Sequence, residues 1–324
     1  MKYTENAINI MAARIYKGIG RAWIVKNLAS NKSEENIVDL LNEGANVDYR
    51  ITLDDFDKKK TTIKKLLIKS KEFIDGVVAI GDDNFPPYRG EVKNSEKPIF
   101  LFYRGDLALL NAQNNNIAVI GLLNPDKETE ETERTVVAKL VENGETIVSG
   151  LAFGCDTIAH RQALDSKGYT VAILPSPLNN IMPAKNKELA NEIVEKKGLL
   201  ITEYLTDAKS KRELGGRYQE RDRLQALFSN YIVLSASYAK NDLGNDSGSR
   251  LAMEYARNYS IPRAVIYDPV VNTNNPKYDL NRQIIKEDPN TIKIDNDNMQ
   301  SAIKKLITFK PKIVEKQTVQ QSMF

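Results

Sequence analysis

The sequence has little sulfur, little histidine and no long apolar run. Its 324 residues include one cysteine, Cys155, and one histidine, His160. A single cysteine excludes an internal disulfide framework, and so few thiol and imidazole ligands argue against a zinc site. No segment reaches the roughly 20 apolar residues of a membrane span, and the first residues lack the apolar core of a signal peptide. We therefore expect a cytoplasmic protein with no cofactor, no metal and no membrane partner.

A large net charge is also lacking. Lysine and arginine number 46 and aspartate and glutamate 43, which leaves a net charge of +3. This balance excludes a uniformly basic surface, so any site for nucleic acid must be local. The length is typical of two domains, one of them large enough to bury a sizeable core.

Short apolar segments alternate with helical patterns from residue 116 onward. Uniformly apolar strands of this kind predict a Rossmann-like, mostly parallel α/β sheet with helices on both faces. Ligands of such sheets bind beyond the carboxyl ends of the strands. Strands are predicted at 117–120, 146–148, 170–174, 199–202, 231–234 and 264–267, and helices at 128–142, 187–195, 221–228 and 250–258.

The first 72 residues have helical periodicity instead, and predict a small helical domain. Its Gly18-Ile19-Gly20 turn is typical of a helix-hairpin-helix or related module. Such a turn is either a simple helix end or a place where backbone amides meet DNA phosphate. Residues 56–73 predict a lysine-rich helix that docks one domain on the other, with a nucleic-acid surface as the alternative. We divide the chain into a helical domain 1–72, a Rossmann-like domain 73–285 and a C-terminal extension 286–324, with a strand at 291–294 and a helix at 299–307.

The segment from Ser149 to His160 is predicted to join a buried strand to a helix. Gly150 and Gly154 allow a sharp turn and a close approach of a ligand. Asp156 is expected at the helix N-cap, where its carboxylate accepts free amides. The turn is either a seat for a phosphate or only a tight, well-capped connection.

Several blocks, in order along residues 1–270, resemble the DNA-processing protein A family, also called Smf. The signature is Ser149-Gly150-Leu151-Ala152-x-Gly154-x-Asp156-x-x-Ala159-His160. The other blocks are Gly18-Ile19-Gly20, Phe85-Pro86-Pro87, Pro98-Ile99-Phe100-Leu101-Phe102-Tyr103-Arg104-Gly105, Pro183-x-x-Asn186-x-x-Leu189, Thr202-Glu203-Tyr204, Arg221-Asp222-Arg223-Leu224-x-Ala226-Leu227-x-Ser229 and Ser247-Gly248-Ser249.

The resemblance implies a homodimeric protein that binds single-stranded DNA with little sequence preference. It also implies a role in loading a RecA-type recombinase onto the strand, with no catalytic cycle. The residues expected to bind nucleic acid or phosphate are Ser149, Gly150, Phe153, Gly154, Lys185, Arg217, Arg221, Arg223, Ser247, Gly248, Ser249 and Arg250.

Among these, Arg221 and Arg223 are favoured as phosphate ligands over surface ion pairs with Glu220 or Asp222. Phe153 or Tyr218 could stack on a base. Asp156 and His160 are interpreted as supports of the loop rather than as a catalytic pair, and Cys155 as a packing residue.

The chain also departs from the family pattern. Where the family has Gly-Ser-Arg after the first strand, this chain has Gly121-Leu122-Leu123, and Arg250 is a candidate to restore the lost charge. A C-terminal winged-helix domain is not expected. The final Gln320-x-x-Met323-Phe324 resembles the peptide by which bacterial proteins bind the sliding clamp, so the clamp is a candidate partner.

One alternative is a nucleotide-binding protein or a nucleoside-monophosphate N-glycosidase, with Glu254 as the carboxylate. Another is a scaffold that has lost its DNA site. A dehydrogenase and a Walker-type ATPase are disfavoured, because neither Gly-x-Gly-x-x-Gly nor Gly-Lys-Ser/Thr is present. The biological process stays open between DNA uptake by transformation, a mobile element and a defence system.

Overall fold

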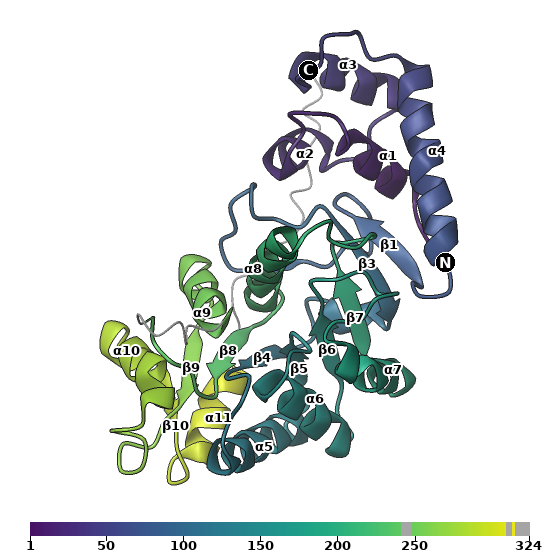
Figure 1. Ribbon diagram of the computed structural model, residues 1–324. Coiled ribbons are helices and arrows are strands. Elements are labelled where there is room, and N and C mark those ends of the chain that lie inside the picture. The colour runs from purple at the N-terminus through teal and green to yellow at the C-terminus, as the bar shows by residue number, and fades with distance from the viewer. Residues whose placement is uncertain (241–247, 309–312, 315–324) are drawn as a thin grey trace.

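The computed structural model describes residues 1–240, 248–308 and 313–314. Its main feature is a nine-stranded sheet in the order β1-β3-β7-β6-β5-β4-β8-β9-β10 (Figure 1). The strands are β1 Gly76–Ala79, β3 Phe100–Gly105, β4 Asn116–Ile120, β5 Thr146–Ser149, β6 Thr170–Ile173, β7 Leu199–Thr202, β8 Tyr231–Leu234, β9 Arg263–Ile266 and β10 Ile292–Ile294. A separate pair joins β2, Tyr88–Arg89, to β11, Ile313–Val314.

The described helices are α1 Glu5–Ala13, α2 Arg21–Leu28, α3 Glu34–Gly44, α4 Leu53–Ser70, α5 Lys127–Glu142, α6 Cys155–Asp165, α7 Lys187–Glu195, α8 Lys211–Leu227, α9 Gly248–Asn258, α10 Asp279–Glu287 and α11 Met299–Thr308. Short 3-10 turns are η1 Leu107–Leu110, η2 Ala184–Asn186 and η3 Pro276–Tyr278. Within the described ranges, no helix is both long and apolar enough to cross a membrane.

Strands β4 to β10 pair in parallel, which confirms the predicted mostly parallel Rossmann-like sheet. From β4 the chain first adds β5, β6 and β7 on one side, and then β8, β9 and β10 on the other. The order therefore reverses at β4 and β8, which opens a crevice at their carboxyl ends. At one edge, β3 pairs antiparallel with β7 and β1 pairs antiparallel with β3. The apolar pattern of the sequence did not predict this antiparallel pairing.

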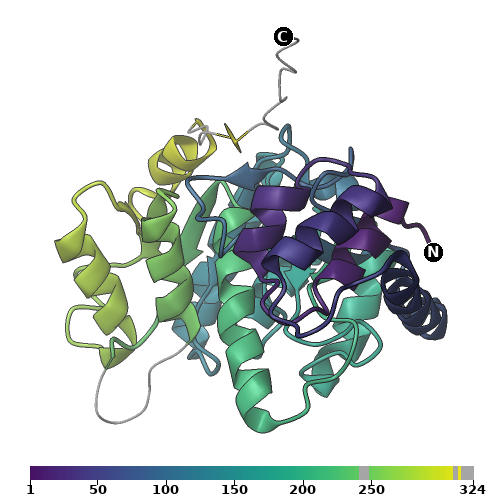
Figure 2. The ribbon, with the colours of Figure 1, turned by 90° about the horizontal axis from the view of Figure 1, so that it is seen from above.

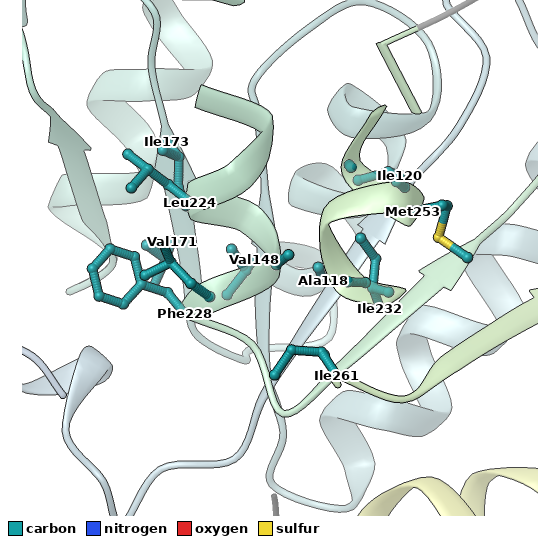
Figure 3. Packing of buried hydrophobic residues seen from close by; sticks show 14 of the residues in the cluster. Ala118, Ile120, Val148, Val171, Ile173, Leu224, Phe228, Ile232, Met253 and Ile261 are labelled. Carbon is teal, nitrogen blue, oxygen red and sulfur yellow. The ribbon is translucent and has the colours of Figure 1, made fainter. Parts of the chain in front are cut away.

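Both faces of the sheet are covered because side chains alternate along each strand. Ala118 and Ile120 pack with Leu224 of α8, with Phe228 just after that helix and with Met253 of α9 (Figure 3). The alternate residues of β4 and β8 point to the other face of the sheet, where they pack with α5 and α11 in a second buried cluster. Every residue of β4, β5, β6, β8 and β9 is buried, as the uniformly apolar strand pattern predicted.

Helices α1 to α4 form a bundle beside the β1 and β3 side of the sheet (Figure 1; Figure 2). Its core is continuous with that of the sheet, because Ile8 and Leu67 belong to the same buried cluster as Phe102 and Leu200. Asp82 ties α1 to the end of β1: its carboxylate accepts hydrogen bonds from the Thr4 hydroxyl (2.8 Å) and the Asn6 amide (2.9 Å).

Two elements bear on the boundaries predicted from the sequence. The helix predicted at 221–228 begins ten residues earlier: Ser210 caps it, and the mostly polar run 211–220 has no apolar stripe that would predict a helix. The strand and helix predicted after residue 290 are confirmed as β10 and α11. The division of the chain into three domains stays a prediction.

Candidate nucleic-acid interface

The loop between β5 and α6 lies at the carboxyl edge of the sheet, and its shape depends on Gly154. Gly154 has a φ of 69°, and a Cβ there would lie 2.2 Å from the carbonyl oxygen of Leu122. The next residue, Cys155, donates its backbone amide to that same oxygen at 2.9 Å. Because only glycine combines this backbone with this approach, the loop is locked against the end of β4.

Asp156 supports the loop, though not from the N-cap that we predicted. Gly154 precedes the helix, and Asp156 is its second residue. The Asp156 carboxylate accepts hydrogen bonds from the amides of Gly150 (3.1 Å) and Ala152 (3.2 Å). These two loop amides are therefore already occupied by the protein's own carboxylate, and whether a phosphate binds at this turn stays a prediction.

A second support of the loop was not assigned from the sequence. The side-chain amide of Asn186 donates to the carbonyl of Leu151 (2.8 Å) and to the hydroxyl of Thr157 (2.9 Å). Thr157 in turn donates to the carbonyl of Ala152 at 2.6 Å. Asn186 belongs to one of the family blocks, but its partners lie more than 25 residues away and only the fold brings them together.

A cavity of about 290 Å³ opens beside this loop, at the point where the strand order reverses. Phe153 and Leu123 are its most exposed walls, with 44% and 53% of their surface accessible. The polar groups in it include Asp156, Arg221 and Asp222. The full lining is Ile120, Gly121, Leu123, Ala152, Phe153, Asp156, Pro183, Tyr218, Arg221, Asp222, Gln225, Gly248 and Ser249.

Arg221 of α8 lies over the backbone of Gly150. A Cβ on Gly150 would lie 1.3 Å from the Arg221 guanidinium, so the glycine is what makes room for the arginine. The guanidinium also forms ion pairs with Asp156 (3.5 Å) and Asp222 (3.4 Å) and lies 5.7 Å from the centre of the Tyr218 ring. The arginine borders the cavity, but two carboxylates offset its charge.

Asp222 and Gln225 complete the polar floor. Burial raises the pKa of Asp222 to about 7, an effect that Arg221 opposes and Asp156 reinforces. With its amide oriented to satisfy its neighbours, Gln225 accepts from the Gly150 amide (3.0 Å) and from Arg221 (3.2 Å). Near neutral pH the carboxyl of Asp222 is therefore partly protonated.

Two of the predicted phosphate ligands serve the fold instead. The Arg223 side chain is 2% exposed and forms ion pairs with Glu203 (2.5 Å) and Glu220 (3.1 Å). Arg217 donates to the carbonyl of Thr206 (2.7 Å) and pairs with Glu213 (2.7 Å). The expectation that Arg223 offers an open phosphate ligand is wrong, because its guanidinium is buried and paired with these two carboxylates. For Arg217 the described contacts are likewise internal.

Other predicted residues also lie outside the cavity lining. The Ser149 hydroxyl is buried and donates to the carbonyl of Val119 at 2.7 Å, so it joins two strands. His160 bonds to Thr170 of β6 (2.7 Å) rather than to the loop, and burial lowers its pKa to about 3, which keeps it neutral. Arg250 pairs with Glu254 at 2.6 Å. Lys185 is exposed in η2, close in sequence to the cavity residue Pro183.

The structure brings Phe153, Arg221, Gly248 and Ser249 together around the cavity, with Gly150 and Gly154 shaping its loop. Ser249 donates its hydroxyl to the carbonyl of Gly121 at 2.8 Å, which holds the start of α9 against the end of β4. Ser247 and the tail residues Gln320, Met323 and Phe324 lie outside the described residues. Cys155 is fully buried with a raised pKa, which is consistent with the predicted packing role.

Known proteins share this sequence and fold. The sequence model described as DNA recombination-mediator protein A matches residues 76–303. The DNA processing protein DprA of Streptococcus pneumoniae is 28% identical over 256 residues, which cover 75% of this chain and 87% of that protein. Protein Smf of Synechocystis is 29% identical over 181 residues, which cover 55% of this chain but only 42% of the Synechocystis protein.

Two solved structures are similar as well. The crystal structure of DprA from S. pneumoniae aligns with a TM-score of 0.67 at 23% identity, covers 93% of this chain and 98% of that one, and supports the fold. A structure of DNA processing protein A from Helicobacter pylori, solved to explain the single-stranded DNA binding mode of that protein, aligns with a TM-score of 0.53 at 27% identity. That alignment covers 65% of this chain and 87% of the H. pylori chain.

The fold is that of a Rossmann-like α/β protein, with a cavity at the switch point of its sheet. Because the family model matches well over half of its length, the chain belongs to the DNA recombination-mediator protein A family, which includes the proteins named DprA and Smf.

Proposed function

We propose that this protein binds single-stranded DNA at the cavity beside the β5–α6 loop. The observation that carries the proposal is an exposed aromatic ring, Phe153, on a rigid loop next to Arg221, in a chain of this family. An aromatic ring with an accessible face binds any base by stacking, so such binding does not depend on the DNA sequence. The single-stranded DNA binding described for the related H. pylori protein supports the same ligand here.

The walls of the cavity favour a base over a phosphate as the group that enters it. Leu123 gives an apolar surface where the family pattern has an arginine, and Arg221 is already paired with Asp156 and Asp222. A phosphate oxygen near these carboxylates would be repelled. We then expect the phosphates outside the cavity, where exposed cations such as Lys185, two residues after the lining residue Pro183, can bind them. Binding should therefore depend on stacking at least as much as on charge.

Family membership supports a finer proposal. We propose that the bound strand is handed to a RecA-type recombinase, that the protein works as a homodimer in the cytoplasm, and that the tail ending in Met323 and Phe324 is a candidate sliding-clamp ligand. The test of the first step is the rate at which a RecA-type recombinase forms filaments on DNA coated with a single-strand-binding protein. An unchanged rate on adding this protein would count against recombinase loading.

A nucleotide ligand is the second candidate, and the observation that favours it is Asp222. A carboxyl in a cavity with a pKa of about 7 is suited to proton transfer. Glu254, the residue proposed from the sequence, is instead paired with Arg250 and does not line the cavity. Release of a free base from nucleoside monophosphates, lost in Asp222→Asn, would establish this activity; no release from any of the common monophosphates would reject it.

The first experiment is fluorescence anisotropy of labelled oligo-dT, with a matched duplex beside it. Phe153→Ala should weaken single-strand binding by about tenfold, since stacking on one base contributes on the order of 1–3 kcal/mol. Tyr169→Ala is the control, because Tyr169 is similarly exposed at 47% but precedes β6, at the opposite edge of the sheet. Equal affinities for the two variants would place the strand elsewhere, and no binding at low salt would reject the proposed function.

A further inference from the structure

The lysines of α4 form a feature that the cavity does not use. Residues 58–71 contain seven lysines and no acidic residue. Two of them attach the helix to its neighbours: Lys60 is buried and forms ion pairs with Glu34 and Glu5, and Lys64 pairs with Glu5 at 3.0 Å. Their charges are therefore neutralised inside the bundle, and the others have to be considered separately.

Lys58, Lys65 and Lys69 share one stripe of the helix, which we call the α4 lysine face. Their spacings of seven and four residues bring them to the same side, and Lys65 and Lys69 are about 6 Å apart along the helix axis. All three are exposed. The opposite stripe, with Phe56 and Leu67, is buried against the bundle. In both ribbon views α4 lies at the outer margin of the molecule (Figure 1; Figure 2).

The charges of this face are little compensated. Lys58 pairs with Asp54 at 2.6 Å, but both side chains are mostly exposed and such pairs are weak. Lys65 and Lys69 have no carboxylate within 4 Å among residues 1–240, 248–308 and 313–314. Other helices place an acid four residues from a cation, as in Arg134–Glu130 of α5. Here two like charges occupy that spacing, which slightly destabilises a helix in isolation and favours an anionic partner.

We infer that the α4 lysine face is a second DNA-contact surface, which binds phosphates of the strand outside the cavity. This goes beyond the proposed function, because it adds a site on a different element with a different chemistry. Flexible lysine stems bind phosphate as point charges without reading sequence, and they release counterions when they do so. Thr61, exposed beside this face, adds a hydroxyl donor.

An anionic membrane is the other polyanion that a basic helix can bind, and the packing of α4 argues against it. A helix that lies in a membrane surface inserts an apolar face opposite its charges. In α4 that face, including Phe56, Ile63 and Leu67, is occupied by the helical bundle. The exposed apolar side chains of α4 are isolated: Leu53 lies in its first turn and Ile68 near its end. Phosphate groups of DNA are therefore the partner that fits this surface.

The test compares a short and a long strand across a salt series. Oligo-dT of about 8 nucleotides should engage the cavity alone, and about 40 nucleotides should reach both surfaces. The variant K58Q/K65Q/K69Q should bind the long strand about tenfold more weakly at low salt, and the slope of log affinity against log salt should fall by about 2, since three phosphate contacts are lost. Its affinity for the short strand should not change.

The matched control is K196Q/K286Q/K304Q, which removes three exposed lysines, one just after α7 and the others on α10 and α11, and leaves α4 intact. It should leave the slope unaltered. Equal loss in both triple variants, or no loss in either, overturns the α4 surface while the cavity stands on its own short-strand binding. Binding of wild type to phosphatidylserine vesicles, without any effect of the α4 variant on DNA, overturns it in favour of a membrane. Failure of wild type to bind either strand rejects both surfaces.

Discussion

The arginines of α8 and the lysines of α4 are two basic clusters of the same chain with opposite environments. Arg223 is enclosed, with both of its carboxylate partners within 3.1 Å, whereas Lys65 and Lys69 extend into solvent. A buried cation requires partners that neutralise it, so its charge is unavailable to a ligand. A solvated cation needs none, and keeps its charge for one. A cationic residue in a family motif should therefore be assigned as a ligand only once its burial is known.

The largest test of this contrast is a change in stability. Arg223→Ala should lower the free energy of unfolding by about 3 kcal/mol, because Glu203, 6% exposed, loses its closer arginine partner and keeps only Arg21, at 3.4 Å. Lys69→Ala should change it by less than about 0.5 kcal/mol, as exposed substitutions do. The measurement is urea unfolding followed by circular dichroism. Similar losses of unfolding free energy in the two variants would contradict the distinction between the buried arginine and the exposed lysine.

A smaller effect is expected at Gly150, where the arginine and the loop meet. In Gly150→Ala the new methyl group overlaps the Arg221 guanidinium, so Arg221 must leave its place between Asp156 and Asp222. We expect a loss of about 2 kcal/mol in stability and a weaker affinity for oligo-dT. Gly216→Ala on α8 is the control, because nothing lies within 4 Å of its added methyl, and it should be neutral or slightly stabilising. If Gly150→Ala binds DNA like wild type, Arg221 has no part in the site.

The smallest effect depends on pH and concerns Glu133, a buried acid of α5 next to Cys155 and Ser235. Burial raises its pKa to about 8, from 4.5 in the unfolded chain. Between these values the unfolded state loses the proton while the folded state keeps it, so Glu133 lowers stability as the pH rises from 4.5 to 8. Each pH unit between these values costs about 1.4 kcal/mol, so Glu133→Gln should gain on wild type by about 1 kcal/mol at pH 6 relative to pH 5.

Thermal unfolding at the two pH values measures this gain. Glu131→Gln, an exposed change on the same helix, should show no such difference, since its carboxylate is 66% exposed. A pH-independent offset in Glu133→Gln would mean that Glu133 is ionised in the folded protein.

Much of the fold could be predicted from the chain because it rests on local patterns. The apolar strands of the sheet and the helix at 187–195 depend on neighbouring residues, and they are present as expected. The start of α8 could not be predicted, since its first ten residues are mostly polar and carry no apolar period. The direction of β3 was likewise hidden, because buried parallel and antiparallel strands share one composition.

The candidate site divides along the same line. The sequence by itself determined that residues 149–160 form a glycine-dependent loop between a strand and a helix, because glycine and apolar spacing act within a few residues. Only the tertiary structure decided what the loop presents. Asp156 took two of the loop amides, Asn186 arrived from η2, and Arg221 crossed over Gly150 while Arg223, two residues on, turned into the protein. Successive residues on a helix point about 100° apart. Packing, and not the motif, therefore decides which arginine meets a ligand.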